Sequence, residues 1–409
     1  MTGPAFATVA ADGRPLRMLV VGAGSMGRAW LRALTAASDV VLAGIVDLDP
    51  LAARAAAVEA GVPDLPTGTD LASVAAATEA DAVIDVTVPA AHLPVTLQAL
   101  DLGLPVLGEK PVAATLAEAL RLVAATELSG RLFMVSQSRR YNRQLAHFRR
   151  LAGRLGALGI LTTEFFRGPH FGGFRDAMAH PLLLDMAIHP FDSARYLLDA
   201  EPVSVYCQEY NPAWSWYAGD AATTAIFEFT DGIRYVYTGS WCSTGMETSW
   251  NGSWRLSGEH GTARWSGDDP AELEATGGPA AGGPAAGVPD AEVPEPDADP
   301  ELPPELRMPS PGEGIDGSLA EFTHALRTGT VPMGEVHENV LSLAMVEAAV
   351  LSATADRRVL LDDVLETAHR EAVTTAGEAV GARLRSWSSV RAALTPLRRE
   401  TPGNVCDTD

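Results

Sequence analysis

The first third of the chain alternates short hydrophobic runs with longer stretches of helical spacing. Runs rich in Val, Ile and Leu, such as RMLVV and VVLAGIV, are followed by Ala-rich stretches such as SMGRAWLRALTAA. Strands that alternate with helices build βαβ units, in which helices cover both faces of a parallel sheet. The pattern therefore predicts an α/β domain over residues 17–135, preceded by a flexible extension over residues 1–16.

After residue 136 the hydrophobic pattern changes to strands that follow one another with turns between them. Examples are LGILTTEFF, PVSVYCQEY and ATTAIFEFT, and one helix interrupts them near residues 181–198. This order is typical of a mixed, largely antiparallel α+β domain, which we place at residues 136–370. Residues 371–409 are expected to form a helical tail with a frayed end.

Residues 268–312 differ in composition from the rest of the chain. They contain 11 prolines, 6 glycines and 11 acidic residues against one basic residue, which predicts an acidic, flexible insertion. The whole chain has 409 residues and a net charge of −22. A charge of that sign repels phosphate backbones and anionic membrane surfaces, so nucleic-acid and membrane partners are not expected.

The cysteines and the N-terminal residues bear on the compartment. Cys207, Cys242 and Cys406 have neither the spacing of a zinc site nor that of a disulfide framework. The first 30 residues lack a basic start followed by an apolar run, and no run of uninterrupted apolar residues approaches 18. These features favour a cytoplasmic protein without a bound metal.

Lysine is almost absent from the chain. Of the 30 cationic residues, 29 are arginine and one is Lys110. Arginine keeps its proton in a protein, whereas burial and neighbouring charges tune a lysine. Lys110 lies in Gly108-Glu109-Lys110-Pro111, directly after a predicted strand, so its side chain should emerge at the carboxyl edge of the parallel sheet. Ligands bind at that edge in open α/β sheets, and we therefore expect an active-site lysine there, with a solvated loop lysine as the alternative.

A glycine-rich turn follows the first predicted strand and opens the first predicted helix. Its sequence is Gly22-Ala23-Gly24-Ser25-Met26-Gly27. In this context G-x-G-x-x-G is typical of a dinucleotide-binding Rossmann fold, because its glycines permit a tight turn, close approach of a pyrophosphate and close packing of the helix. The motif by itself could also be only a tight strand-to-helix turn.

The second predicted strand ends at Asp47, 20 residues after Gly27. A carboxylate there can accept hydrogen bonds from both hydroxyls of the adenosine ribose, and it repels the 2′-phosphate of NADP. No arginine follows directly, so we predict NAD rather than NADP as the cofactor. Asp49 is interpreted as a turn or helix-cap residue.

The helix predicted near residues 181–198 contains a possible acid–imidazole pair in the sequence LLLDMAIHPFD. In an α-helix Asp185 and His189 would share one face, and a carboxylate beside an imidazole holds its tautomer and raises its basicity. Taken alone, the two could equally be a helix-face acid and a satisfied core histidine. Pro190 also indicates that the helix could bend at this point.

The order of these motifs resembles the Gfo/Idh/MocA family, which includes glucose-fructose oxidoreductases and inositol dehydrogenases. The resemblance rests on GAGSMG, the acidic end of the second strand, TVPAAH, GEKP and the D-x-x-x-H helix, and it covers roughly residues 17–365. It implies a Rossmann domain followed by an α+β domain with a large, mostly antiparallel open sheet, through which members often form dimers or tetramers. It also implies NAD(P)-dependent hydride transfer at a hydroxyl carbon of a sugar, cyclitol or related polyol.

The resemblance assigns roles to the matching residues. Lys110, Asp185 and His189 match the family's lysine and its aspartate–histidine dyad. His92 matches a Pro-x-x-His turn that lies beside the cofactor, where Val88 and Pro89 are better contact candidates than the imidazole, which could cap the next helix. The predicted cofactor contacts are Gly22, Gly24, Ser25, Met26, Gly27, Asp47, Val88, Pro89, His92, Glu109 and Lys110.

Substrate contacts are predicted in the catalytic group, in the run RGPHFGGFR before the dyad helix, and at the domain junction. The candidates are Lys110, Tyr141, Arg167, His170, Arg175, Asp185 and His189, with Arg139 and Asn142 as further ones. Outside the catalytic group, a surface or interdomain salt bridge is an equal alternative. Several tryptophans could stack on a sugar ring, although packing in the core or at a subunit interface is favoured for most of them. These are Trp214, Trp216, Trp241, Trp250 and Trp254.

The hypothesis is that His189 removes a hydroxyl proton, Asp185 stabilises the imidazolium, and Lys110 donates a hydrogen bond to the developing alkoxide. The base is expected to titrate near neutrality, and Lys110 and His189 could exchange roles in proton delivery. One alternative is oxidation at another carbonyl centre, for example of a dihydrodiol, or a redox step within a lyase or glycosidase cycle. The other is a catalytically silent NAD-dependent ligand sensor.

Overall fold

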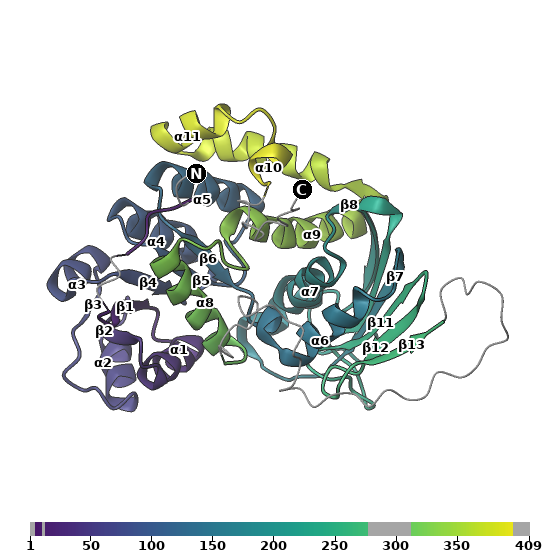
Figure 1. Cartoon of the computed structure of the whole chain (residues 1–409), viewed down its shortest axis with the longest axis horizontal. Helices are drawn as coiled ribbons and strands as arrows, with labels where there is room; N and C mark the ends of the chain where they lie inside the picture. Colours follow the sequence, from purple (N-terminus) through teal and green to yellow (C-terminus); the bar gives the residue numbers. More distant parts are fainter. Residues whose placement is uncertain (1–4, 10–12, 277–311, 396–409) are drawn as a thin grey trace, which may run out of the picture.

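Two β-sheets lie side by side in the computed structural model, which describes residues 5–9, 13–276 and 312–395 (Figure 1). The first sheet has six strands in the order β3-β2-β1-β4-β5-β6, and all of its neighbouring strands pair in parallel. Its strands are β1 Leu16–Val21, β2 Val40–Val46, β3 Thr67–Gly68, β4 Ala82–Asp85, β5 Val106–Glu109 and β6 Phe133–Ser136. The predicted parallel α/β domain is confirmed, and only the short β3 was not foreseen.

Helices connect the strands of this sheet, as a doubly wound fold requires. They are α1 Ser25–Ala36, α2 Pro50–Glu59, α3 Leu71–Thr78, α4 Pro89–Asp101 and α5 Leu116–Ser129. Asp49 is the N-cap of α2 and accepts a hydrogen bond of 2.9 Å from the Leu51 N–H, so its predicted role as a helix cap is confirmed. The strand order reverses between β1 and β4, and the carboxyl ends of these strands therefore form the ligand-binding edge.

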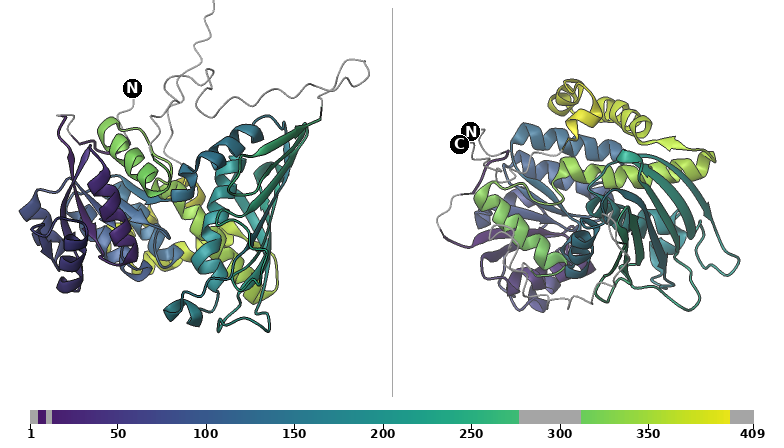
Figure 2. Two further views of the ribbon diagram at one scale, coloured as in Figure 1. Left: turned by 90° about the horizontal axis from the view of Figure 1, so that it is seen from below. Right: turned by 45° about the vertical axis from the view of Figure 1, so that its right-hand side comes forward.

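The second sheet has eight strands in the order β13-β12-β11-β7-β10-β9-β8-β14. Only β7 and β10 pair in parallel, so the predicted mostly antiparallel sheet is confirmed. The strands are β7 Leu158–Phe166, β8 Pro202–Tyr210, β9 Ala222–Phe229, β10 Arg234–Ser240, β11 Ser253–Gly258, β12 Gly261–Trp265, β13 Glu272–Ala275 and β14 Val359–Leu360. One face packs against the helices α6 Arg143–Ala152, α7 Ile188–Leu198 and α9 Val336–Ala355, and the other carries no helix among the described residues (Figure 2).

The sequence analysis placed the helices between residues 312 and 370 in the second domain. The structure shows that not all of them pack there. Helix α8 (Ile315–Thr328) packs against α1 and β6, because its buried Leu319 and Phe322 find apolar partners beside the first sheet. Helices α10 (Leu361–Thr375) and α11 (Glu378–Arg385) pack against α5, and α12 (Val390–Ala393) packs on α10. The expected boundary at residue 370 falls inside α10, which packs against α9 and β8 of the second domain as well as against α5.

Two expected flexible segments are partly structured. In the N-terminal extension Phe6 is only 5% exposed, and the Ala7 and Val9 N–H groups donate to the carbonyls of Gly130 and Leu326, each at 2.8 Å. The start of the expected acidic insertion forms the edge strand β13. The rest of that insertion, at 277–311, and the expected frayed end, at 396–409, lie outside the described residues.

Among the described residues, α9 is the one helix that is long and apolar enough to cross a membrane. It packs against β8, α7 and α5, and 13 of its 20 residues are buried. Burial on several sides is the ordinary position of a core helix in a globular domain.

Candidate active site

The glycine turn between β1 and α1 has the geometry that a dinucleotide requires. Gly22 has a φ of +106°, and a Cβ there would lie 2.7 Å from the Val86 carbonyl oxygen. A Cβ on Gly27 would overlap the Gly22 carbonyl oxygen, whereas a Cβ on Gly24 would have nothing within 4 Å. Two of the three glycines therefore permit close packing, and the third leaves backbone open to a ligand.

The N-terminus of α1 is free to bind an anion. Gly24 is its N-cap, no side chain caps it, and its first turn contains no acidic residue. Ser25 begins the helix, and Met26 beside it is 45% exposed. The unpaired N–H groups and the helix dipole at such an end favour phosphate. The residues of this turn therefore fit the pyrophosphate of NAD.

Asp47 is fixed beside the glycine turn. Its Oδ2 accepts a 2.7 Å hydrogen bond from the Ala23 N–H, and its Oδ1 accepts one of 2.9 Å from the Asp49 N–H. The next residue, Leu48, is 92% exposed and brings no positive charge. A carboxylate held there can accept ribose hydroxyls and repels an added phosphate, so the arrangement fits NAD better than NADP.

The turn after β4 separates exposed residues from a buried one. Val88 is 66% exposed, and Pro89, also exposed, is the first residue of α4. His92 is only 2% exposed, and its Nδ1 and Nε2 lie 2.8 Å and 3.1 Å from the carbonyl oxygens of Pro111 and Thr87. The His92 ring therefore links the turn after β4 to the turn after β5 and does not cap a helix. Because it is buried there, the prediction of His92 as a cofactor contact is wrong in this structure.

Lys110 brings the two domains together at the end of β5. Its Nζ donates a 2.9 Å hydrogen bond to the main-chain oxygen of Asp185, a residue 75 positions away. Burial lowers the pKa of Lys110, and the charges of Arg139 and Arg175 add to this effect while Asp185 and Glu109 oppose it. The Glu109 carboxylate accepts hydrogen bonds from Trp30 Nε1 at 2.8 Å and from the Lys110 N–H at 3.2 Å.

The dyad segment is not an ordinary α-helix. Residues Leu182–Ala187 form a π-helical turn, and α7 begins directly after it. The Asp185 carboxylate accepts a 2.8 Å hydrogen bond from Arg175 Nε, while His189 Nδ1 is buried without a hydrogen-bond partner. The predicted contact between Asp185 and His189 is therefore absent, because the wider turn changes the spacing on which the i, i+4 argument rested. Such π-turns are frequent at functional sites.

His189 lies in a strongly positive environment. Burial lowers its pKa well below the ordinary value, and the charges of Lys110 and Arg139 lower it further. The expectation of a base that titrates near neutrality is therefore wrong in direction. The imidazole is neutral at physiological pH, so it is able to accept a proton from a hydroxyl group.

Arg139 enters the same site from the 3-10 helix η1 (Ser138–Tyr141), which follows β6. Its Nη1 donates to the Trp250 carbonyl oxygen and, at 3.1 Å, to Asn251 Oδ1. Within the described part of the chain no carboxylate forms an ion pair with it. Burial lowers the pKa of Arg139 to about 10, so the guanidinium remains charged at neutral pH.

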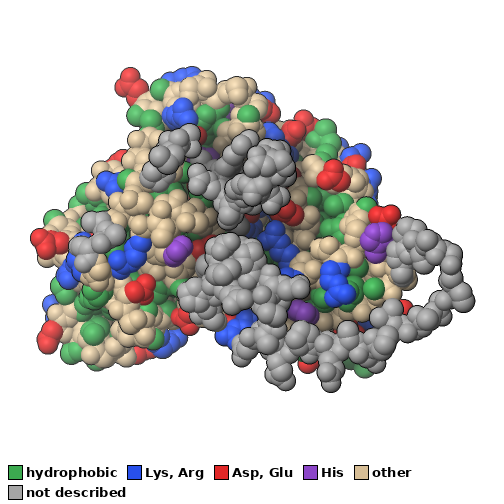
Figure 3. All heavy atoms as spheres, in the orientation of Figure 1, with side chains coloured by type: hydrophobic (Ala, Val, Ile, Leu, Met, Phe, Trp, Pro, Cys, Tyr) green, Lys and Arg blue, Asp and Glu red, His purple; other side chains and the backbone are tan. Residues whose placement is uncertain are grey.

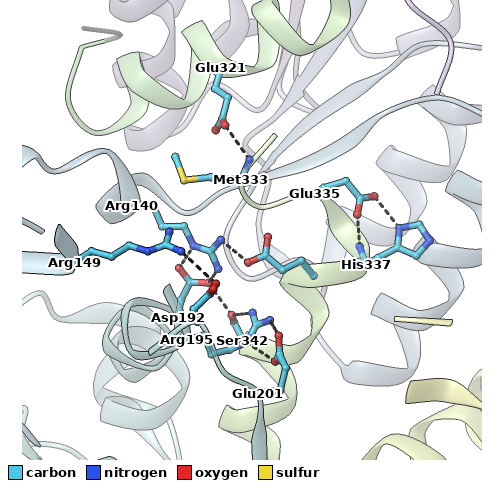
Figure 4. A network of polar contacts seen from close by, with 12 residues as sticks. Arg140, Arg149, Asp192, Arg195, Glu201, Glu321, Met333, Glu335, His337 and Ser342 are labelled. Atoms are coloured by element: carbon cyan, nitrogen blue, oxygen red, sulfur yellow. Dashed lines mark hydrogen bonds and ion pairs between the residues drawn. The ribbon is translucent and has the colours of Figure 1, made fainter. Parts of the chain in front are cut away.

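A buried ionic network supports the site from below, and sequence reasoning missed it (Figure 4). Arg140 forms a two-point ion pair with Asp192, with both hydrogen bonds 2.7 Å long, and a third hydrogen bond of 2.6 Å with Glu338. Asp192 also accepts a 2.7 Å hydrogen bond from Ser342. The only sequence signal was that Asp192 follows His189 by three positions. The network ties η1, α7 and α9 together and so fixes the backbone that carries Arg139 and His189.

The remaining substrate candidates at the domain junction and after β7 mostly have structural partners. Tyr141 is 8% exposed and donates to Glu321, and Asn142 is the N-cap of α6, so neither prediction of a substrate contact is supported. Arg167 pairs with Glu247 at 2.9 Å and lies over the Trp250 ring.

His170 and Arg175 lie in the segment between β7 and the dyad. The exposed His170 ring stacks on Trp216 at 3.6 Å. Trp241 and Trp254 are buried in the core, as the favoured interpretation expected, whereas Trp214 and Trp250 are 62% and 41% exposed.

Both domains of the chain match models of one oxidoreductase family. Residues 16–137 match the description "Oxidoreductase family, NAD-binding Rossmann fold". Residues 149–264 match the "GFO/IDH/MocA C-terminal domain", and the two matches together span more than half of the chain. The chain belongs to the Gfo/Idh/MocA family. The predicted family, the predicted fold and the predicted NAD cofactor are thereby confirmed.

Relatives with assigned activities act on polyols or sugars. Inositol 2-dehydrogenase 4 of Saccharopolyspora erythraea is 32% identical over 198 residues, which are 47% of this chain and 56% of that protein. The match thus spans about half the length of that relative. D-apiose dehydrogenase of Paraburkholderia graminis is 27% identical over 374 residues, which are 88% of this chain and 93% of that protein.

The fold is also that of a solved family member. The crystal structure of myo-inositol dehydrogenase from Lactobacillus casei in complex with NAD(H) and myo-inositol has a TM-score of 0.66. Its sequence is 21% identical, and the alignment covers 85% of this chain and 96% of that one. This likeness concerns the arrangement of the two domains.

Proposed function

We propose that this protein is an NAD-dependent dehydrogenase that oxidises a secondary hydroxyl group of a sugar, cyclitol or related polyol. The observation that carries the proposal is the meeting of Lys110, from the nucleotide-binding domain, with Asp185 and His189 of the second domain. This meeting lies at the carboxyl edge of the parallel sheet, which also carries the glycine turn. Ligands of open α/β sheets bind at that edge.

Each of the three residues has a defined task. NAD, when bound, supplies the acceptor for the hydride that leaves the hydroxyl carbon. The neutral imidazole of His189 accepts the hydroxyl proton, and the Lys110 ammonium donates a hydrogen bond to the oxygen as it becomes negative. Asp185 positions Lys110 through its main-chain oxygen and holds Arg175 through its carboxylate.

A spectrophotometric assay tests this function. The purified protein is mixed with NAD and a panel of sugars and cyclitols, and the reduced nicotinamide is followed by its absorbance. We expect turnover of at least one polyol, with a higher kcat/KM for NAD than for NADP. Absence of turnover, together with NADH binding confirmed by calorimetry, would favour the ligand sensor instead.

We propose further that copies of the chain form a homodimer or homotetramer through the uncovered face of the second sheet. Ile160, Tyr206 and Ile226 support this proposal, because they are 42%, 37% and 46% exposed on strands whose outer face no described helix covers. Exposed apolar side chains on an open sheet favour association. Light scattering after gel filtration should give a dimer or tetramer mass, and Ile226→Arg should lower it.

We also propose a cytoplasmic location. The two cysteines in the described residues, Cys207 and Cys242, are buried and form no disulfide, which suits a reducing compartment. Fractionation of cells that produce the protein should recover it with cytoplasmic markers.

A further inference from the structure

The loop before the dyad carries an arginine whose outer end is unused. Arg175 lies in the 3-10 helix η2 (Gly173–Ala177), and its Nε donates to Asp185 Oδ2. The rings of Phe171 and Phe174 flank its guanidinium, with centroids 5.3 Å and 4.8 Å away. Its two terminal nitrogens have no hydrogen-bond partner among the described residues, and its side chain is 35% exposed. The aromatic rings and Asp185 thus hold a guanidinium that is still able to bind a ligand.

One of the arginines near Lys110 has no ion pair among the described residues. Arg139 and Arg175 are the cations whose charges act on Lys110, and Asp185 and Glu109 are the carboxylates that do so. Of the two arginines, Arg175 is paired with Asp185, whereas no carboxylate among the described residues forms an ion pair with Arg139, in a chain whose net charge is −22. Figure 3 shows basic side chains gathered near the junction of the two domains on the face it presents.

An uncompensated charge in a partly buried site is costly. Desolvation of a guanidinium is offset only when an anion pairs with it, and a neutral hydroxyl group offsets it poorly. A carboxylate matches the planar fork of arginine with two parallel hydrogen bonds. It also brings a single negative charge, whereas a phosphate monoester brings about 1.5 to 2.

We propose that the substrate is a sugar acid, a polyol that carries a carboxylate, and that the terminal nitrogens of Arg175 bind this carboxylate. The positive charge of Arg139, which no carboxylate among the described residues pairs with, favours the same group from within the site. This inference rests on the proposed dehydrogenase function and narrows its substrate class. Arg175 is then the residue that separates acidic from neutral polyols.

Matched pairs of substrates test this specificity. D-gluconate is compared with D-glucitol, and D-glucuronate with D-glucose, in steady-state kinetics with NAD. We expect kcat/KM to be about 10- to 100-fold higher for the acids, as a charge-assisted pair contributes about 1.5–3 kcal/mol. A phosphorylated sugar, D-glucose 6-phosphate, tests the other anion.

Variants locate the effect at Arg175. Arg175→Gln should raise KM for the acid about 10- to 100-fold and leave KM for its neutral partner within about 2-fold, and Arg175→Lys should restore part of the loss. Arg149→Gln is the matched control, because Arg149 is also 35% exposed, pairs with Asp199 at 3.2 Å and lies over the Tyr196 ring. The control should change neither KM.

A binding readout separates this inference from the function on which it rests. With NADH present, the sugar acid should raise the melting temperature more than its neutral partner, and Arg175→Gln should abolish that difference. Better turnover of the neutral partner or of the phosphorylated sugar would overturn the inference and leave the dehydrogenase intact. No turnover at all, with the acid still stabilising the protein through Arg175, would overturn the function and keep the binding site.

Discussion

Arg139 and Arg140 are consecutive residues of one 3-10 turn, yet they lie in opposite electrostatic surroundings. Arg140 is 2% exposed and pairs with Asp192 and Glu338 in the network below the site. Arg139 faces Lys110 and His189 and has no ion pair within the described ranges. Each of these charged groups below the site has an ion-pair partner, whereas the site itself keeps an arginine without one.

The difference between the surroundings of Arg140 and Arg139 distinguishes residues needed for stability from residues needed for function. A buried ion pair that loses one partner leaves an uncompensated charge, so the paired region must remain intact for the fold. A cation without a partner adds little to the fold, but it lowers the pKa values of its neighbours and attracts anions. Replacing single residues on each side of this boundary should therefore produce opposite effects on stability and catalysis.

The largest effect on kcat is expected from Lys110→Met, in the site that contains the unpaired Arg139. Removal of the ammonium should lower kcat by about 10³-fold or more, because it removes the donor assigned to the developing alkoxide. The melting temperature and NADH affinity should stay close to those of the wild type. Steady-state kinetics, calorimetry and thermal unfolding measure the three quantities. Retention of more than a tenth of kcat would remove Lys110 from the mechanism.

Arg140→Met should produce the reverse pattern. The change leaves Asp192 and Glu338 without their cation, which we expect to lower the free energy of unfolding by about 3–5 kcal/mol. Arg149→Met is the control, since Arg149 is 35% exposed, pairs with Asp199 and lies over the Tyr196 ring. It should cost about 1 kcal/mol or less. Urea unfolding measures both, and equal losses would contradict the comparison.

Arg139→Gln should leave stability almost unchanged and alter the pH profile. Arg139 helps to lower the pKa of His189, so its loss should raise that pKa. In the wild type the acidic limb of kcat/KM should lie below pH 6.5, because the base must be unprotonated. In the variant the limb should move to higher pH. An unmoved limb would mean that His189 is not the titrating base.

The smallest effect on catalysis is expected at His337, whose ion-pair partners Glu127 and Glu335 are not residues of the site. Burial opposes the charged form of His337, but hydrogen bonds with Glu127 and Glu335 outweigh it and raise its pKa to about 9. The interaction of protonated His337 with these two glutamates therefore stabilises the fold fully below pH 6.5, and this stabilisation is lost as the pH rises through 9. His337→Gln should cost about 2–3 kcal/mol at pH 7 and almost nothing at pH 10. A pH-independent loss in urea unfolding would contradict this assignment.

Local patterns were sufficient for most of the fold. The βαβ order, the glycine turn and the acid at the end of β2 depend on residues close in sequence, and the structure has all three. The domain boundaries could not be read in the same way, because an apolar helix face does not specify its partner. Helix α8 therefore packs on the first sheet although it follows the second in the chain.

The sequence by itself identified Lys110 as the lone lysine, its place after β5, and Asp185 and His189 as the residues that lie near it. The tertiary structure decided the pairing of the charges. Asp185 binds Arg175 instead of His189, and Arg140 binds Glu338, 198 positions away. Ion pairs form between groups that packing brings within about 4 Å, and a linear pattern specifies no such distance. Which cations are left for a ligand is therefore a property of the folded chain.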